Sequence, residues 1–149
     1  MTISQKCQYA LRAIFELSRR YRQGPTIIAE VAEVQAIPPK FLELILGELR
    51  QGGFVESRRG KRGGYLLSLP PDQVTVGQII RFIEGPIAPV KCIAGQDSAP
   101  CPLHGRCAFI GLWERAENAV AEVYDTTTLQ DLIDQDASMS ARYVDSYCI

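Results

Sequence analysis

The sequence predicts a mainly α-helical fold that contains one small β-hairpin. Three observations support this prediction. Apolar residues recur at helical spacing in three separate stretches before residue 52. Two short runs typical of β-strands then flank a glycine-rich tip at residues 58–64. From residue 108 onward, apolar residues recur at the spacing of a heptad repeat.

Three helices are expected in the first part of the chain. Ser4 is a suitable N-cap for a helix over residues 4–22. Thr26 is expected to cap a second helix that runs to about Val34. The third is expected to start at Pro38-Pro39, because proline is well tolerated at a helix start, and to end near Gln51.

The short connection between the second and third helices is typical of a helix-turn-helix unit. In such a unit the N-terminal residues of the second helix meet base edges in the major groove of DNA. Pro39, Lys40, Glu43 and Leu44 are expected at that position. Glu43 can accept a hydrogen bond from a cytosine amine. An ordinary helical hairpin in a small bundle remains the alternative interpretation.

A basic hairpin follows directly. Strands are expected over Phe54–Ser57 and Tyr65–Leu69. The tip between them carries three glycines and four cations, namely Arg58, Arg59, Lys61 and Arg62. Guanidinium groups on a flexible tip suit phosphates or a narrow minor groove. The pattern predicts the wing of a winged helix-turn-helix domain, with a merely solvated charged loop as the alternative.

A further helix is expected from Val76 to Gly85, packed back on the first one. We therefore expect a winged DNA-binding domain over residues 1–85. A cysteine-rich metal or redox loop is expected over 86–107, and a dimerisation helix with a C-terminal tail over 108–149.

The last of these segments contains the most regular apolar pattern. Phe109, Trp113, Ala116, Val120 and Val123 follow a/d heptad spacing, which predicts the central helix of a homodimer. A helix folded onto its own domain is the alternative.

Beyond that helix, a break is expected at residues 125–128. A short helix over Leu129–Ile133 should follow it. We expect the apolar tail from Met139 to Ile149 to pack against the dimer helices.

Charge is distributed unevenly along the chain. Residues 1–66 carry 11 Lys or Arg and 6 Asp or Glu, whereas residues 67–149 carry 5 and 11. This asymmetry indicates that the first half meets nucleic acid. No signal peptide or membrane span is expected, so we predict a cytoplasmic protein. No nucleophile–base pair or phosphate loop is evident, so an enzyme is not expected.

Cys92, Cys101 and Cys107 lie within sixteen residues, together with the single histidine, His104. Clustered thiolates favour an iron–sulfur cluster, zinc or Cu(I). An iron–sulfur cluster is the first expectation, with [2Fe–2S] favoured over [4Fe–4S]. His104, Cys7 of a partner subunit or an exogenous group would then be the fourth ligand. A Cys₃His zinc site and a metal-free thiol switch are the alternatives.

The chain resembles the IscR/NsrR/CymR family of winged-helix transcription regulators over nearly its whole length. The matching residues are Lys6, Tyr9-Ala10, Phe41-Leu42-Glu43, Leu49-Arg50, Gly53, Arg59-Gly60, residues 63–67 and the three loop cysteines. The resemblance implies a homodimer on a palindromic promoter site. It also implies base contact by Glu43, with Lys40 and Phe41 beside it, and insertion of Arg59 into the minor groove.

Within that family, segments 85–87 and 125–132 resemble the cysteine-metabolism repressor branch. The expected function is a dimeric DNA-binding transcription regulator, with affinity set by metal or cluster binding at Cys92, Cys101 and Cys107. The alternative is a metal-free CymR-like repressor controlled by a thiol switch or a partner protein.

Overall fold

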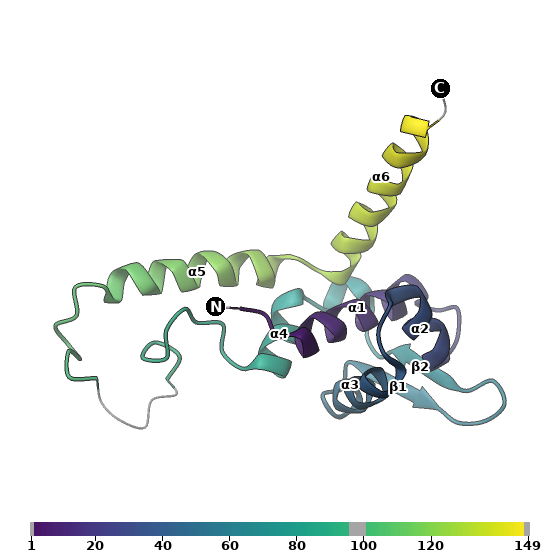
Figure 1. Cartoon of the computed structure of the whole chain (residues 1–149), viewed down its shortest axis with the longest axis horizontal. Helices are drawn as coiled ribbons and strands as arrows, with labels where there is room; N and C mark the ends of the chain where they lie inside the picture. The colour runs from purple at the N-terminus through teal and green to yellow at the C-terminus, as the bar shows by residue number, and fades with distance from the viewer. Residues whose placement is uncertain (1, 96–100, 148–149) are drawn as a thin grey trace.

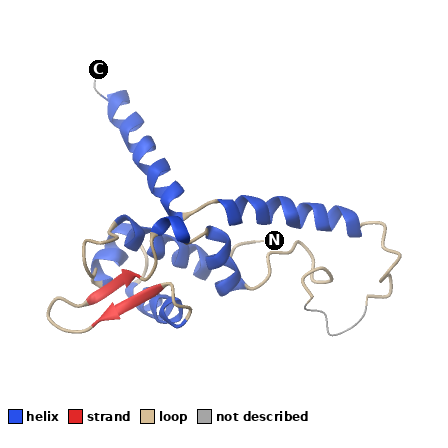
Figure 2. Cartoon of the chain, turned by 180° about the vertical axis from the view of Figure 1, so that it is seen from behind, coloured by secondary structure: helices blue, strands red, loops and turns tan. Residues whose placement is uncertain are grey.

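The protein is described by a computed structural model that covers residues 2–95 and 101–147, with backbone alone for 141–147. Figures 1 and 2 show a helical body, a protruding two-stranded hairpin and two long C-terminal helices. The elements are α1 (Gln5–Arg19), α2 (Ile28–Gln35), α3 (Pro39–Gln51), β1 (Val55–Arg58), β2 (Gly64–Leu67), η1 (Pro71–Gln73), α4 (Val76–Glu84), α5 (Ile110–Thr126) and α6 (Leu129–Tyr147). The predicted mainly α-helical fold with a small β-wing is confirmed.

Helix α1 is the centre of the body, because α2, α3, α4, α6 and β2 all pack against it. Its apolar face, which includes Ala10, Ile14 and Leu17, is buried in the main core. Ser4 caps this helix as predicted, since its hydroxyl accepts a hydrogen bond of 3.2 Å from the backbone N–H of Cys7. The helix ends at Arg19, three residues earlier than the sequence pattern indicated.

Helices α2 and α3 form the predicted helix-turn-helix pair. Ala36 adopts a left-handed conformation after α2, with φ of 48°. This turn directs Ile37 into the core and leaves Pro38-Pro39 to start α3. One face of α3 is then buried through Leu42, Ile45, Leu46 and Leu49.

Thr26 does not cap α2, contrary to the sequence-based prediction. The N-cap is Ile27, and no side chain completes it. Thr26 instead exchanges two backbone hydrogen bonds of 2.8 Å with Tyr65 and is buried. The hydrogen bonds that this backbone segment forms with the edge of the hairpin therefore replace the local capping interaction.

The hairpin pairs β1 and β2 in an antiparallel register that sets Val55 opposite Leu67 and Arg58 opposite Gly64. Val55 and Leu67 face the core, so the hairpin is anchored at its base. Gly64 has a φ of +152°, and a Cβ there would collide with the backbone of Thr26. Glycine is therefore required at the point where the hairpin leaves the body.

Helix α4 connects the body to the two C-terminal helices. Thr75 and Gln78 form a capping box at its start. The backbone N–H of Val76 donates to the carbonyl of Thr127, and that of Leu129 donates to the carbonyl of Val74, both at 2.9 Å. Leu129 is buried in the main core. These contacts fasten the α5–α6 junction to the body.

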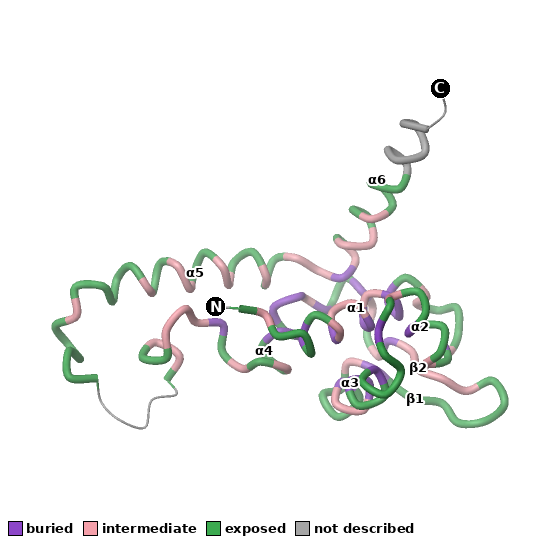
Figure 3. The backbone as a smooth tube through the Cα atoms, in the orientation of Figure 1, coloured by how far each residue is buried: buried purple, intermediate pink, exposed green. Residues whose placement is uncertain are grey.

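Helix α5 extends away from the body, and none of its residues is buried (Figure 3). Phe109 just before it and Val123 near its end are 60% and 61% exposed. Only its last turns pack on the body, where Val120 and Tyr124 contact the cluster that contains Cys7 and Ile80. The alternative to a dimerisation helix, namely a helix that folds onto its own domain, therefore describes only the C-terminal end of α5.

Helix α6 continues to Tyr147, so the expected short helix over Leu129–Ile133 was wrong. The apolar spacing fades after Ile133, which suggested a stop, yet residues 134–147 contain no glycine or proline to end the helix. The tail-packing prediction concerns residues 139–149. Met139 is 59% exposed in this chain. The side chains of residues 141–147 and all of residues 148–149 lie outside the described part. No described helix is long and apolar enough to cross a membrane.

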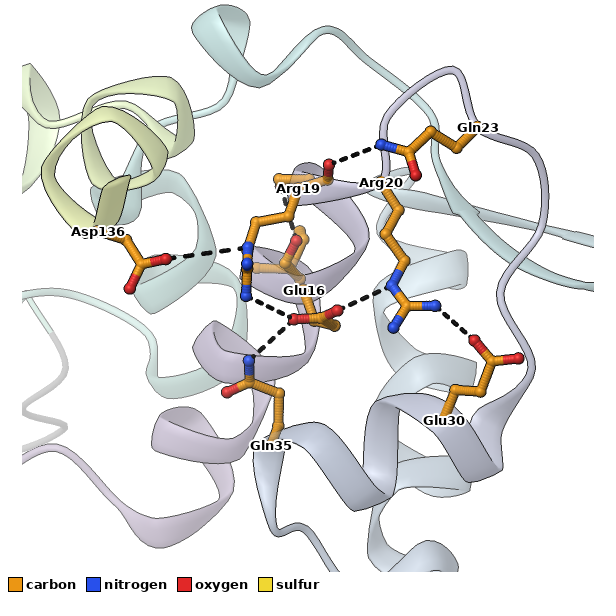
Figure 4. A network of polar contacts seen from close by, with 9 residues as sticks. Glu16, Arg19, Arg20, Gln23, Glu30, Gln35 and Asp136 are labelled. Carbon is orange, nitrogen blue, oxygen red and sulfur yellow. Dashed lines mark hydrogen bonds and ion pairs between the residues drawn. The ribbon is translucent and has the colours of Figure 1, made fainter. Parts of the chain in front are cut away.

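A buried carboxylate organises the polar contacts at the end of α1 (Figure 4). Glu16 is 3% exposed and accepts hydrogen bonds from Arg20 Nε at 2.8 Å and Gln35 Nε2 at 3.1 Å. Arg20 also pairs with Glu30 of α2. Arg19 lies between Glu16 and Asp136 of α6, at N···O distances of 3.6 and 3.9 Å. The network therefore joins α1 to both α2 and α6.

Replacing Glu16 by Gln should lower the free energy of unfolding by about 1–3 kcal/mol, because one of the two buried acceptor oxygens and the charge that faces Arg20 are lost. Urea denaturation at one fixed protein concentration measures the change. Glu33→Gln removes the same charge from an exposed position of α2, and its effect should stay within about 0.5 kcal/mol. Equal stability of the two variants would contradict the role assigned to Glu16.

Candidate nucleic-acid interface and cysteine pocket

The outer face of α3 presents every residue that the sequence placed there. Pro39, Lys40, Phe41 and Glu43 are all exposed, because the inward positions of the same helix fill the core. Phe41 and Leu44 are 60% and 68% exposed, so two large apolar side chains lie on this outer face. Such side chains beside a lysine and a glutamate suit a base edge, where a thymine methyl provides an apolar contact.

The cations of the hairpin tip are exposed as well. They are Arg58, Arg59, Lys61 and Arg62. Among the described residues, every ion pair lies elsewhere, for example between Lys6 and Glu48 or between Arg81 and Asp125. These four cations have no acidic partner among the described residues, so they repel one another and favour a polyanion.

The orientation of the hairpin relative to α3 is set by two contacts at its base. Arg50 Nη1 of α3 donates to Ser57 Oγ of β1 at 3.0 Å. Phe54 meets Phe82 of α4 edge to face, with ring centroids 5.4 Å apart. The base of the hairpin is thus attached to both α3 and α4.

The loop that contains Cys92, Cys101 and Cys107 connects α4 to α5. It lies at the opposite side of the molecule from the hairpin (Figure 1). A hollow of about 470 Å³ is lined by side chains that include Cys92, Cys101, Cys107 and His104. The structure therefore brings the four predicted metal-site residues to one place. The segment 96–100 of this loop lies outside the described residues.

The chemistry of these donors fits a thiolate-bound metal or cluster. All three thiols are free, with Cys92 and Cys101 exposed and Cys107 half-buried. Within residues 2–95 and 101–147, however, no three His, Cys, Asp or Glu side chains are close enough to hold one metal ion. The donors thus surround a common hollow, and metal binding requires that they approach one another.

Cys7 lies in a different environment from the loop cysteines. It is completely buried against Val76, Ile80 and Ile87. Burial, assisted by the nearby carboxylate of Glu84, raises the pKa of its thiol to about 11. A protonated, enclosed thiol is a poor metal ligand, so Cys7 of a partner subunit does not fit the role of fourth ligand in this conformation.

Two further lining residues were not suggested by the sequence. Glu114 and Glu117 of α5 face the same hollow as the cysteines. Ile110, Glu114 and Glu117 stand at positions i, i+4 and i+7 of the helix. This spacing places all three on one helix face. Glutamates at such spacing are common on exposed helices, so the pattern became informative only once the loop was positioned beside α5.

Glu117 also lines a second, smaller hollow together with Arg81 of α4. Arg81 forms a two-point ion pair with Asp125, in which Nη2 and Oδ2 are 2.8 Å apart. This guanidinium holds the pKa of Asp125 below its usual value. Asp125 also lies against Gly77, where a Cβ would collide with the carboxylate. The pair fastens the C-terminal end of α5 to the winged domain.

Comparison with known proteins gives a consistent result. The model of the family Rrf2, described as an iron-dependent transcriptional regulator, matches residues 3–135. The HTH-type transcriptional regulator CymR of Bacillus subtilis is 39% identical over 132 residues, which cover 89% of each chain. IscR of Aliivibrio salmonicida is 31% identical over 133 residues, which cover 89% of this chain and 77% of the relative.

The solved structure of CymR, the global cysteine regulator of B. subtilis, superimposes with a TM-score of 0.74 at 38% identity. The match covers 91% of this chain and 98% of that one. These relatives are transcription regulators, which confirms the expectation that the protein is not an enzyme.

Alkylation of the metal-free native protein should separate the cysteines into two classes. At pH 8, iodoacetamide should modify Cys92, Cys101 and Cys107, because they are accessible, and should leave Cys7 unmodified. Cys7 should react only after denaturation, since its raised pKa and its burial both protect it. Peptide mass spectrometry measures the labelled fraction at each position. Rapid native labelling of Cys7 would contradict the buried position.

Proposed function

Because the chain belongs to the Rrf2 family of transcriptional regulators, we propose that it is a dimeric, DNA-binding regulator whose affinity for DNA depends on a metal cofactor. In this proposal an iron–sulfur cluster is held by Cys92, Cys101 and Cys107. The single observation that carries the proposal is the position of these free thiols around one hollow beside α5. The helix-turn-helix and the wing lie at the opposite side of the molecule from the loop that contains these thiols (Figure 1).

DNA recognition is assigned to α3 and the hairpin tip. Glu43 would accept a hydrogen bond from a cytosine amine, and Lys40 and Phe41 would contact the neighbouring positions of the major groove. Pro39 would start the helix at the groove. Arg59 would enter the minor groove, while Arg58, Lys61 and Arg62 would contact phosphates. The exposure of all eight side chains supports this assignment.

The dimer is assigned to α5. None of its a/d positions is fully buried, and Phe109 and Val123 are exposed, although Val120 packs on the body. A second copy of the helix would cover the exposed positions. A two-fold dimer would present its two α3 helices to a palindromic promoter site, with half-sites about one DNA turn, roughly 34 Å, apart. Residues 1–85 would then be the DNA-binding unit, 86–107 the sensing loop, and 108–149 the dimerisation unit, in a cytoplasmic protein.

The cysteine loop would regulate this geometry. A bound cluster supplies charge neutralisation for the thiolates and a redox-sensitive group. Drawing Cys92, Cys101 and Cys107 together would reshape the segment between α4 and α5. Because α5 is fastened to α4 by Arg81 and Asp125, that change would alter the separation of the two winged domains. A [2Fe–2S] form is favoured over [4Fe–4S], and His104 is one available fourth donor.

Two other states of the loop are compatible with the same residues. A Cys₃His zinc site would use the three thiols and His104. The second candidate function is a metal-free, CymR-like repressor that is controlled by oxidation of two thiols to a disulfide or by a partner protein. The similarity to CymR and the exposure of Cys92 and Cys101 favour this second candidate.

Arg59→Ala should weaken specific DNA binding by about 1–3 kcal/mol if this side chain reads the minor groove. Fluorescence anisotropy measures the change, with a labelled promoter duplex that the wild type binds specifically and at a moderate, fixed salt concentration. Arg115→Ala removes the same charge from an exposed position of α5 and should leave DNA affinity unchanged in the dimer. If both variants bind as tightly as the wild type, the wing assignment is wrong.

Purification without oxygen tests the cofactor. We expect visible absorption between roughly 320 and 460 nm and matched amounts of iron and sulfide. Substituting Cys92, Cys101 and Cys107 together by Ala should abolish that absorption and lower DNA affinity. One zinc per chain in a colourless sample would favour the Cys₃His site. A triple variant that binds DNA as tightly as the cluster-loaded wild type would contradict cluster control.

A further inference from the structure

We infer that Glu114 is the fourth protein ligand of the thiolate-bound metal centre. The inference rests on the proposed metal-binding function of the cysteine pocket and names a residue of that same site. Glu114 and the three cysteines line one hollow, although the glutamate belongs to α5 and the cysteines to the preceding loop. The centre would therefore have three sulfur ligands and one carboxylate oxygen ligand.

Helix geometry directs this side chain toward the loop. Ile110 begins α5, and its backbone N–H donates to the carbonyl of Cys107 at 3.3 Å. Glu114 lies one turn further on the same face, about 6 Å along the helix axis. Side chains of a helix tilt toward its N-terminus, so the Glu114 carboxylate leans back toward Cys107.

The other carboxylate at the hollow, that of Glu117, lies near the guanidinium of Arg81. Glu117 lines both the cysteine hollow and the smaller hollow that contains Arg81. It lies close enough to Arg81 to contribute to the raised pKa of that guanidinium. The described residues show no cation paired with Glu114. Of the two carboxylates, Glu114 is thus the one that remains available to a metal.

Glu114 also has an advantage over His104 as a ligand. His104 belongs to the loop, whose turns are held by single backbone hydrogen bonds such as that from His104 N–H to the Cys101 carbonyl at 2.8 Å. Glu114 is part of a regular helix of 17 residues. A donor on a regular helix is positioned more accurately than one on a loop. Carboxylates are established ligands of non-haem iron.

The same assignment gives α5 a direct role in sensing. Because the donors do not yet surround one ion, binding has to bring Cys92, Cys101 and Cys107 toward the helix. A ligand on α5 provides the fixed point for that approach. The loop and the proposed dimerisation helix would become one unit whenever the metal centre is occupied.

Anaerobic reconstitution of the full-length protein with ferrous iron and sulfide tests the inference. The variants are Glu114→Gln, Glu117→Gln, His104→Gln and, as a matched control outside the hollow, Glu122→Gln. Iron and sulfide content, visible absorption, electron paramagnetic resonance of the reduced centre and the rate of iron release to a chelator are measured. Glu114→Gln should release iron at least about tenfold faster than the wild type. The other variants should behave like the wild type.

Glu114→Cys separates ligation from a merely structural role. A thiolate at this position should retain iron and should change the sulfur-to-iron absorption and the resonance of the reduced centre, because the ligand atom has changed. Unchanged spectra in this variant, or loss of iron in His104→Gln alone, would overturn the assignment of Glu114. If the wild type takes up no iron and sulfide, the proposed function fails as well. If the wild type and Glu114→Gln retain iron equally, only the present inference fails.

Discussion

The burial of a carboxylate in the central helix is the constraint on which the arrangement of the winged domain depends. Glu16 lies on α1, against which α2, α3, α4, α6 and β2 pack. A buried charge is costly unless hydrogen-bonded partners surround it. Arg20 and Gln35 provide these partners and fix α2 relative to α1. Since α3 follows α2 after a tight turn, the position of the exposed α3 face depends on the same contacts.

A second ionic contact, between exposed side chains, lies at the other end of α1, where the winged domain meets α5. Arg81 and Asp125 form a two-point ion pair, and backbone hydrogen bonds join Val74 and Val76 to the residues after α5. None of the residues of α5 is buried. One end of this helix therefore follows the DNA-binding unit, while the other end lies beside the cysteines. Such a helix can transmit a local change at the thiols to the spacing of α3 helices in a dimer.

Much of the fold could be read from local patterns. Apolar residues at helical spacing predicted α1, α3 and α4. Glycines between two runs of strand-forming residues predicted the hairpin. The exceptions involve contacts between distant residues. Thr26 pairs with Tyr65 across the chain rather than capping α2. The extent of α6 was missed because polar residues conceal a helix that contains no breaker, and Leu129 at its start is anchored by the core of the winged domain.

The sequence by itself determined most of the helices, the basic hairpin and the types of soft ligand present, because these depend on residue chemistry and on short-range spacing. Only the tertiary structure decided which of the chemically similar groups share an environment. It enclosed the thiol of Cys7 in the core and left Cys92, Cys101 and Cys107 around one hollow. It also placed Glu114 beside them, because a glutamate on a helix acquires a specific role only when a distant loop folds against its face.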